Sequence, residues 1–151
     1  MQGKTQALQG DYEHVCSSDP AIDQKAKGWR ATYDAAIETS ALDTLPLKAG
    51  SKPVVWKLRQ LGRRERAHVR DTLSRTGVNR ASEDAVRLAL VGADGAHDSA
   101  GDEIVVDRNE RVAEFLAVNE AVLDRIEQTY GPEILGELWV RVAASLNPQR
   151  G

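Results

Sequence analysis

Residues 110–146 read ERVAEFLAVNEAVLDRIEQTYGPEILGELWVRVAASL, and this stretch decides the predicted fold. Its apolar residues recur three and four positions apart, the spacing that places side chains on one face of a helix. Gly131-Pro132 interrupts the pattern, because glycine favours the end of one helix and proline the first position of the next. We therefore predict two long helices, over about Glu110–Thr129 and from Pro132 to Leu146, each with one buried face.

Upstream of these helices, residues 42–61 carry the strongest β pattern. Positions 54–59 alternate between two faces and include β-branched and aromatic residues, as a half-buried strand requires. Residues 49–52, Ala-Gly-Ser-Lys, are typical of a turn. We predict a hairpin here, with the strand around Pro46 at its edge because proline has no backbone N–H to donate. Ile104–Val106 is predicted to add a third short strand.

The remaining elements complete an α+β fold that is mostly α. We predict a helix over Arg63–Arg75, stopped by Gly77, and a second short helix capped by Ser82. Residues 1–41 are expected to form an extended N-terminal arm, and residues 42–151 a single domain. In that domain a hairpin or three-stranded sheet packs on the two long C-terminal helices and the shorter ones.

Composition narrows the class of protein. A chain of 151 residues with 28% charged residues suits one globular domain. A single cysteine, Cys16, rules out an intrachain disulfide and fits a reducing cytosol. No apolar run approaches the roughly 20 residues that span a bilayer, and the N-terminus lacks the apolar core of a signal peptide. We therefore expect neither a membrane protein nor an exported one.

Charge is unevenly distributed along the chain. Residues 52–75 hold eight Lys or Arg against two acidic residues, whereas residues 76–151 hold seven Arg against fourteen Asp or Glu. The overall net charge is −3, which argues against a general binder of nucleic acid. A basic middle and an acidic C-terminal half can be complementary to each other in neighbouring copies of the chain.

The arginines of the basic segment form the predicted partner-binding site. Arg63, Arg66 and Arg70 are spaced three and four apart and share one helical face, and Arg59 extends the patch from the strand. Such a face can dock an acidic protein surface, bind phosphates of a nucleic acid, or simply be solvated. Trp29 follows Gly28 in a polar segment and is the tryptophan most expected to meet another chain.

Two weaker constellations could carry chemistry. His14 and Cys16 are two residues apart, but a nucleophilic cysteine also needs an orienting group and zinc needs about four ligands. We expect incidental polar residues of an arm here. The acidic residues around His97, from Asp94 to Glu103, do not match a calcium-binding loop, and a solvated surface loop is expected. The sequence thus predicts no catalytic residue, metal or cofactor.

The order of parts resembles small proteins from the structural and morphogenesis gene clusters of tailed bacteriophages. The resemblance covers roughly residues 42–146. Its hydrophobic patterns lie in four parts: Leu45–Leu61, the arginine-rich helix, Ala85–Gly92 and Ile134–Leu138. Some of those proteins are tail assembly chaperones and others are minor virion proteins of the head, neck or tail. The family has no catalytic motif, so the resemblance assigns no functional residue.

We therefore expect a non-enzymatic structural or assembly component of a tailed-phage virion, located in the particle or in the host cytoplasm during assembly. Its expected partners are other phage structural proteins, or copies of itself in an oligomeric assembly, rather than membranes or nucleic acid. The alternatives are a transient tail assembly chaperone and a nucleic-acid-binding module using Arg59–Arg70. A sheltered cleft joining His14, Cys16 and an acidic side chain would overturn this interpretation.

Overall fold

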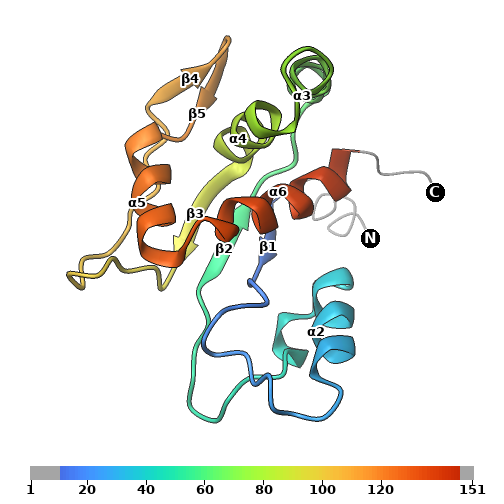
Figure 1. Cartoon of the computed structure of the whole chain (residues 1–151), viewed down its shortest axis with the longest axis vertical. Coiled ribbons are helices and arrows are strands. Elements are labelled where there is room, and N and C mark those ends of the chain that lie inside the picture. Colours follow the sequence, from blue (N-terminus) through green and yellow to red (C-terminus); the bar gives the residue numbers. More distant parts are fainter. Residues whose placement is uncertain (1–10, 147–151) are drawn as a thin grey trace, which may run out of the picture.

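The computed structural model describes residues 11–146 and has an α+β fold dominated by helices, as predicted (Figure 1). The helices are α2 (Trp29–Glu38), α3 (Arg63–Thr76), α4 (Val78–Ala89), α5 (Glu120–Tyr130) and α6 (Glu133–Leu146), with a 3-10 helix η1 (Leu42–Thr44). The strands are β1 (Tyr12–His14), β2 (Val55–Leu58), β3 (Leu90–Asp94), β4 (Glu110–Val112) and β5 (Phe115–Ala117).

The strands form a three-stranded antiparallel sheet, in the order β1-β2-β3, and a separate β4-β5 hairpin. Strand β2 is central: Trp56 lies opposite His14 on one side and Ala93 on the other. The predicted hairpin partner of this strand is therefore wrong, because its neighbours come from residues 12–14 and 90–94. Leu47, from the expected edge strand, forms only an isolated bridge with Ile22. Residues 104–106 are also not a strand.

The C-terminal helices differ from the prediction at one end. Helix α6 matches it, whereas α5 begins at Glu120 rather than Glu110, and a hairpin occupies residues 110–117. Ala113 adopts a left-handed φ of 55° between β4 and β5, which reverses the chain where the predicted helix would have continued. Asn119 then caps α5, its side chain accepting a hydrogen bond from the Ala121 N–H at 2.8 Å. Helix α4 likewise begins earlier than expected, at Val78.

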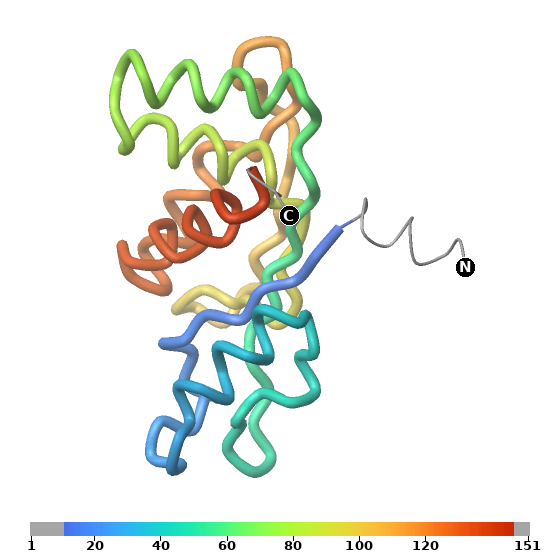
Figure 2. The backbone as a smooth tube through the Cα atoms, turned by 90° about the vertical axis from the view of Figure 1, so that its right-hand side faces the viewer, coloured from blue at the N-terminus to red at the C-terminus, as the bar shows by residue number. Residues whose placement is uncertain are grey.

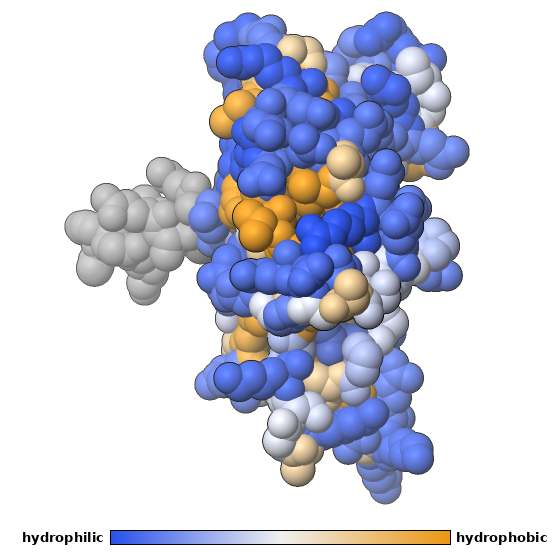
Figure 3. Space-filling model, turned by 90° about the vertical axis from the view of Figure 1, so that its left-hand side faces the viewer, coloured by the Kyte–Doolittle hydropathy of each residue, from blue (hydrophilic) through white to orange (hydrophobic). Residues whose placement is uncertain are grey.

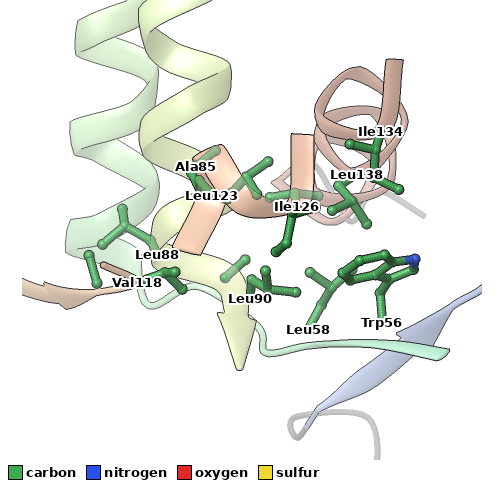
Figure 4. Packing of buried hydrophobic residues seen from close by; sticks show 14 of the residues in the cluster. Trp56, Leu58, Ala85, Leu88, Leu90, Val118, Leu123, Ile126, Ile134 and Leu138 are labelled. Atoms are coloured by element: carbon green, nitrogen blue, oxygen red, sulfur yellow. The ribbon is translucent and has the colours of Figure 1, made fainter. Parts of the chain in front are cut away.

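The main core lies between the three-stranded sheet and helices α4, α5 and α6 (Figure 4). Trp56 and Leu58 of β2 and Leu90 of β3 point toward Ile126 of α5 and Leu138 of α6, and all five are at most 1% exposed. Burying each such side chain contributes roughly 1.5–3 kcal/mol. The alternation along β2 and the helical stripe of α6, both visible in the sequence, meet in this core.

A second, smaller cluster of buried residues lies around α2, at the lower end of Figure 1. Its buried members, called here the small cluster, are Val15, Ile22, Tyr33, Ala36 and Leu45. Residues 11–41 are thus folded onto the rest of the chain, and Leu45 carries the cluster across the predicted boundary at residue 41. The first ten residues of the expected arm lie outside the described part of the chain. Within residues 11–146, none of the helices has the length and apolar character needed to cross a membrane.

Candidate functional site

The carboxylate of Glu137 connects the N-terminal segment to α6. Residue 137 flanks the buried stripe of α6, one position before the fully buried Leu138, and so faces the segment that follows β1. Glu137 Oε2 lies 2.8 Å from His14 Nε2 and accepts from the Ser17 N–H at 2.8 Å and the Tyr33 hydroxyl at 3.0 Å. Its other oxygen accepts from Ser17 Oγ at 3.2 Å. Glu137 with its donors His14, Ser17 and Tyr33 is called here the Glu137 hub.

Cys16 joins this group, so the expectation of incidental polar residues at positions 14 and 16 is wrong. Ligand atoms of His14, Cys16 and Glu137 all lie within 4.8 Å of one another. The His14 and Cys16 residues are only 4% and 3% exposed, and the side chain of Glu137 is 26% exposed. The pairing of β1 with β2 fixes His14, and α6 supplies the acidic side chain from a position 121 residues beyond Cys16.

Burial and hydrogen bonding set the protonation states of the group. Burial alone would raise the pKa of Glu137, but hydrogen bonds from His14 and the Ser17 N–H outweigh it and lower the pKa to about 2. Burial raises the pKa of the Cys16 thiol well above its ordinary value, and the charge of Glu137 adds to this. The pKa of Tyr33 is raised for the same two reasons. The hub therefore holds a carboxylate surrounded by hydrogen-bonding groups.

The grouping of His14, Cys16 and Glu137 would indicate an enzyme if Cys16 were an activated nucleophile in a sheltered cleft. A nucleophilic cysteine needs a lowered pKa and contact with substrate. Cys16 has a raised pKa and does not line the cavity of about 490 Å³ that His14, Ser17, Tyr33 and Glu137 border. His14 Nε2 is engaged by Glu137 rather than by the thiol. The group has the residues of a cysteine site without its activation.

Arg141, one turn after Glu137 on α6, lines that cavity and an adjoining one of about 570 Å³. Its guanidinium lies over the ring of Tyr12, 4.9 Å from the centroid. The Nε atom is buried without a hydrogen-bond partner among residues 11–146. The two cavities adjoin Glu38 of α2 and Ala144 of α6, so a hollow follows the space between these two helices.

The structure divides the predicted arginine patch into two parts. Arg59 faces inward: Nε donates to the Leu88 carbonyl at 2.9 Å, and the guanidinium pairs with Glu65. The pKa of Glu65 is lowered, since the hydrogen bond from Arg59 overcomes the opposing effect of burial. Arg66 donates to the Leu61 carbonyl at 2.7 Å. These two arginines therefore hold the start of α3 against the sheet.

Arg63 and Arg70 are exposed on α3 and have no ion-pair partner within the described residues. They are seven positions apart, so they lie on the same face two turns from each other. The neighbouring Arg64 pairs with Glu114 of the β4-β5 turn. Trp29 is half-buried at the start of α2, where it packs on the small cluster and contacts Tyr33 edge to face. Its ring is thus used mainly within the chain.

The acidic loop around His97 is organised by an arginine. Asp98 Oδ2 accepts from Arg125 at 2.7 and 3.1 Å, while Oδ1 accepts from the N–H groups of Ala100 and Asp102. The hydrogen bond from Arg125 is the main cause of the lowered pKa of Asp98. Donors therefore occupy both carboxylate oxygens of Asp98, while Asp94, Asp102 and Glu103 are exposed beside it.

Glu137 is the residue of the candidate site that sequence reasoning missed. Its only signal was position: an acidic residue next to the apolar stripe of the most regular helix. Comparison with known proteins adds no further guide, since no family model, curated protein or solved structure matches this chain. The candidate sites are therefore interpreted from their own geometry.

Proposed function

We propose that this chain is a non-catalytic component of an assembly, acts through protein–protein contacts, and belongs to the virion of a tailed bacteriophage. The observation that carries the contact role is the exposed basic face of α3, with Arg63 and Arg70 at its centre. The phage setting rests on the resemblance of residues 42–146 to phage structural and morphogenesis proteins. These two supports are independent, so each is tested separately below.

Helix α3 has the properties of a docking helix. Only Val69 and Thr72 of its fourteen residues are buried, and it packs mainly against α4 at one end of the molecule (Figure 2). A helix that is polar on most of its surface gains little stability from a core, so its exposed face is free for another purpose. Leu73, 42% exposed, adds an apolar contact beside the arginines.

Acidic groups lie on a different part of the surface from α3. Asp102, Glu103 and Asp107 are exposed in the loop before β4, and Asp124 is exposed on α5. Figure 1 places α5 and this loop on the side of the molecule away from α3. Opposite charges on separate surfaces cannot neutralise each other within one copy, but they can between two. A contact of this kind is head-to-tail and builds rings or filaments.

Other exposed apolar residues could widen such contacts. Val105 and Leu116 are 57% and 50% exposed on the loop and on β5, and Val140 is 65% exposed on α6. Figure 3 shows that the face it displays is mostly hydrophilic, with its largest apolar patch near the middle. Small apolar areas within a polar surface are typical of non-obligate protein interfaces.

Nucleic-acid binding through α3 is the second candidate, favoured by the same free arginines. Against it stand the net charge of −3 and the engagement of Arg59 and Arg66 by the chain itself. Two arginines remaining free on α3 would neutralise few phosphates, and such binding would be weak and highly salt-dependent.

Sedimentation velocity at low and high salt tests the contact role. We expect concentration-dependent association of the purified chain at low salt and its loss at high salt, because exposed charges are screened. The double variant Arg63→Glu, Arg70→Glu should stay monomeric at low salt. The matched control is Lys25→Glu, Lys27→Glu, which changes the charge equally at two exposed positions near α2 and should associate like the wild type. Association unaffected by the α3 variant would refute the assigned surface.

Mass spectrometry of purified phage particles tests whether the chain is a component of the virion. A virion component should be found in stoichiometric amounts after the particles are washed in high salt. A tail assembly chaperone would be present in infected cells but absent from the particles. Absence from both would contradict the phage assignment while leaving the salt-dependent association intact.

A further inference from the structure

We propose that His14, Cys16 and Glu137 bind a divalent transition metal of the zinc type, which ties the N-terminal segment to α6. This inference concerns the Glu137 hub and is independent of the contact role proposed for α3. It rests on the placement of three ligating side chains, on an unpartnered buried nitrogen, and on a cavity that reaches the site.

The three side chains form a mixed nitrogen, sulfur and oxygen ligand set. One ligand atom from each lies within 4.8 Å of the others. Zinc bonds of about 2.0–2.3 Å in tetrahedral geometry require ligand atoms roughly 3.3–3.6 Å apart. The separations exceed that spacing by at most about 1.2–1.5 Å, so the side chains must move together on binding. Because His14 Nε2 is held by Glu137 at 2.8 Å, Nδ1 is the imidazole nitrogen left to bind the ion.

The imidazole of His14 gives a second, independent indication. Its Nδ1 atom is buried without a hydrogen-bond partner among residues 11–146, on a residue that is 4% exposed. An unsatisfied buried polar atom costs roughly 1–3 kcal/mol, so it calls for a ligand or another physical reason. His14 Nε2 is hydrogen-bonded to Glu137, so Nδ1 is the ring nitrogen that has no partner among residues 11–146.

The access of water to the site and its number of protein ligands also fit a zinc ion. The cavity of about 490 Å³ bordered by His14, Ser17, Tyr33 and Glu137 brings water to two of the three ligands, His14 and Glu137. Three protein ligands then leave the fourth tetrahedral position for a water molecule. On binding, the Cys16 thiol gives its proton to solvent and coordinates as the thiolate.

The donor set selects the class of ion. Thiolate and imidazole favour zinc and its neighbours in the first transition row, whereas calcium and magnesium require mainly oxygen ligands. The oxygen-rich loop around Asp98 lacks such soft donors, and its carboxylate is held by Arg125. We therefore expect the ion at the Glu137 hub and not at the acidic loop.

Cobalt(II) spectroscopy on the full, reduced chain provides the test. Cys16 is the only cysteine in the sequence, so a thiolate-to-cobalt charge-transfer band in the near ultraviolet can arise from no other residue. We expect this band, together with intense visible bands of tetrahedral cobalt, to saturate at one equivalent and to disappear when zinc is added. Addition of zinc should also raise the midpoint of thermal unfolding.

Variants then assign the remaining ligands. Cys16→Ala should abolish the charge-transfer band, and His14→Ala should weaken cobalt binding by about 100-fold or more, since loss of even a supporting neighbour costs about 10- to 100-fold. His97→Ala is the matched control, because this histidine is exposed on the acidic loop. The cobalt affinity of this variant should equal that of the wild type.

Two outcomes would overturn the proposal. One is the absence of a charge-transfer band in the folded wild-type chain at millimolar cobalt, a result that does not depend on whether any variant folds. The other is an equal cobalt affinity for the wild type and a folded Cys16→Ala variant, which would mean that the ion binds elsewhere.

Discussion

The main core and the region around α2 are stabilised in different ways. The main core buries apolar side chains from eight helices and strands, among them Trp56, Leu88 and Ile126. The small cluster has five buried residues, two of which are alanine and tyrosine, and its tyrosine is anchored by the Glu137 hub. The first region depends on the amount of apolar surface removed from water, and the second depends on the direction of a few hydrogen bonds.

The largest loss of stability should come from a substitution in the main core. Leu138→Ala removes a fully buried side chain of α6 and should lower the free energy of unfolding by about 3–4 kcal/mol, through lost burial and the cavity left behind. Val140→Ala, on the same helix but 65% exposed, should change it by about 0.5 kcal/mol or less. Urea unfolding followed by circular dichroism measures both, and similar values for the two would contradict the assigned core.

Glu137→Ala should cause the second-largest loss of stability, and it should destabilise the region around α2 more than the main core. It leaves the Ser17 N–H, the Tyr33 hydroxyl and His14 without their acceptor, a loss of about 2–3 kcal/mol. We expect hydrogen exchange to become faster over residues 12–38 while α4 and β3 stay protected. Asp124→Ala, at an exposed acidic position on α5, is the control. The measurement is made with a chelator present, and uniform loss of protection would mean that the two regions unfold together.

Tyr33→Phe sharpens the comparison at a single hydroxyl. That group lies 2.6 Å from the Val15 carbonyl and 3.0 Å from Glu137 Oε2. Its removal should cost about 1–1.5 kcal/mol, because the small cluster has little apolar surface to compensate. Tyr130→Phe removes a hydroxyl whose partner, His97, is exposed and should cost about 0.5 kcal/mol or less. Thermal unfolding of the two variants side by side distinguishes them.

The smallest effect concerns a carboxyl group in the opposite situation to Glu137. Burial raises the pKa of Glu83 on α4, and a hydrogen bond with the Glu120 carboxyl adds to this. A raised folded-state pKa stabilises the protein below the unfolded value and loses that contribution as pH rises through the folded value. Glu83→Gln, which stays neutral, should therefore be slightly more stable than wild type at pH 7 and gain nothing at pH 4. Unfolding midpoints at both pH values measure this, and a gain at acid pH alone would reverse the sign.

The sequence predicts the main core better than the small cluster for a physical reason. The stripe of α6 and the alternation of β2 are local patterns that repeat, so neighbouring residues report the same buried face. In contrast, the pairing of β2 with β1 and β3 depends on contacts 32 to 46 residues away, and no local feature of Val55–Leu58 specifies them. The predicted local hairpin failed for that reason.

The helix expected from Glu110 failed because a short apolar spacing has two interpretations. Val112, Phe115 and Leu116 are three and four apart, as in a helix, yet they also fit two three-residue strands joined by a tight turn. The turn requires a left-handed residue, and the sequence supplies Ala113 rather than glycine or asparagine, so it gives no warning.

The residues of the candidate sites also differ in whether local sequence patterns could predict their positions. Arg63 and Arg70 could be placed on an exposed face from helical spacing alone, because both lie within one element. The inward direction of Arg59 required knowledge that Leu88 and Glu65 lie beside it. The grouping of His14, Cys16 and Glu137 required the whole fold, since residues 14 and 137 are joined only through the packing of α6 beside β1.

That separation in sequence has a consequence for how the protein is made. Residues 12–38 leave the ribosome first, yet Tyr33 and His14 find their acceptor only when Glu137 has been added. At about 5–20 residues per second, synthesis of the intervening chain takes on the order of ten seconds. During that interval the small cluster, whose buried residues lie between positions 15 and 45, has its apolar side chains but lacks the carboxylate that accepts from Tyr33 and His14, so this region reaches its full stability only after α6 has been made.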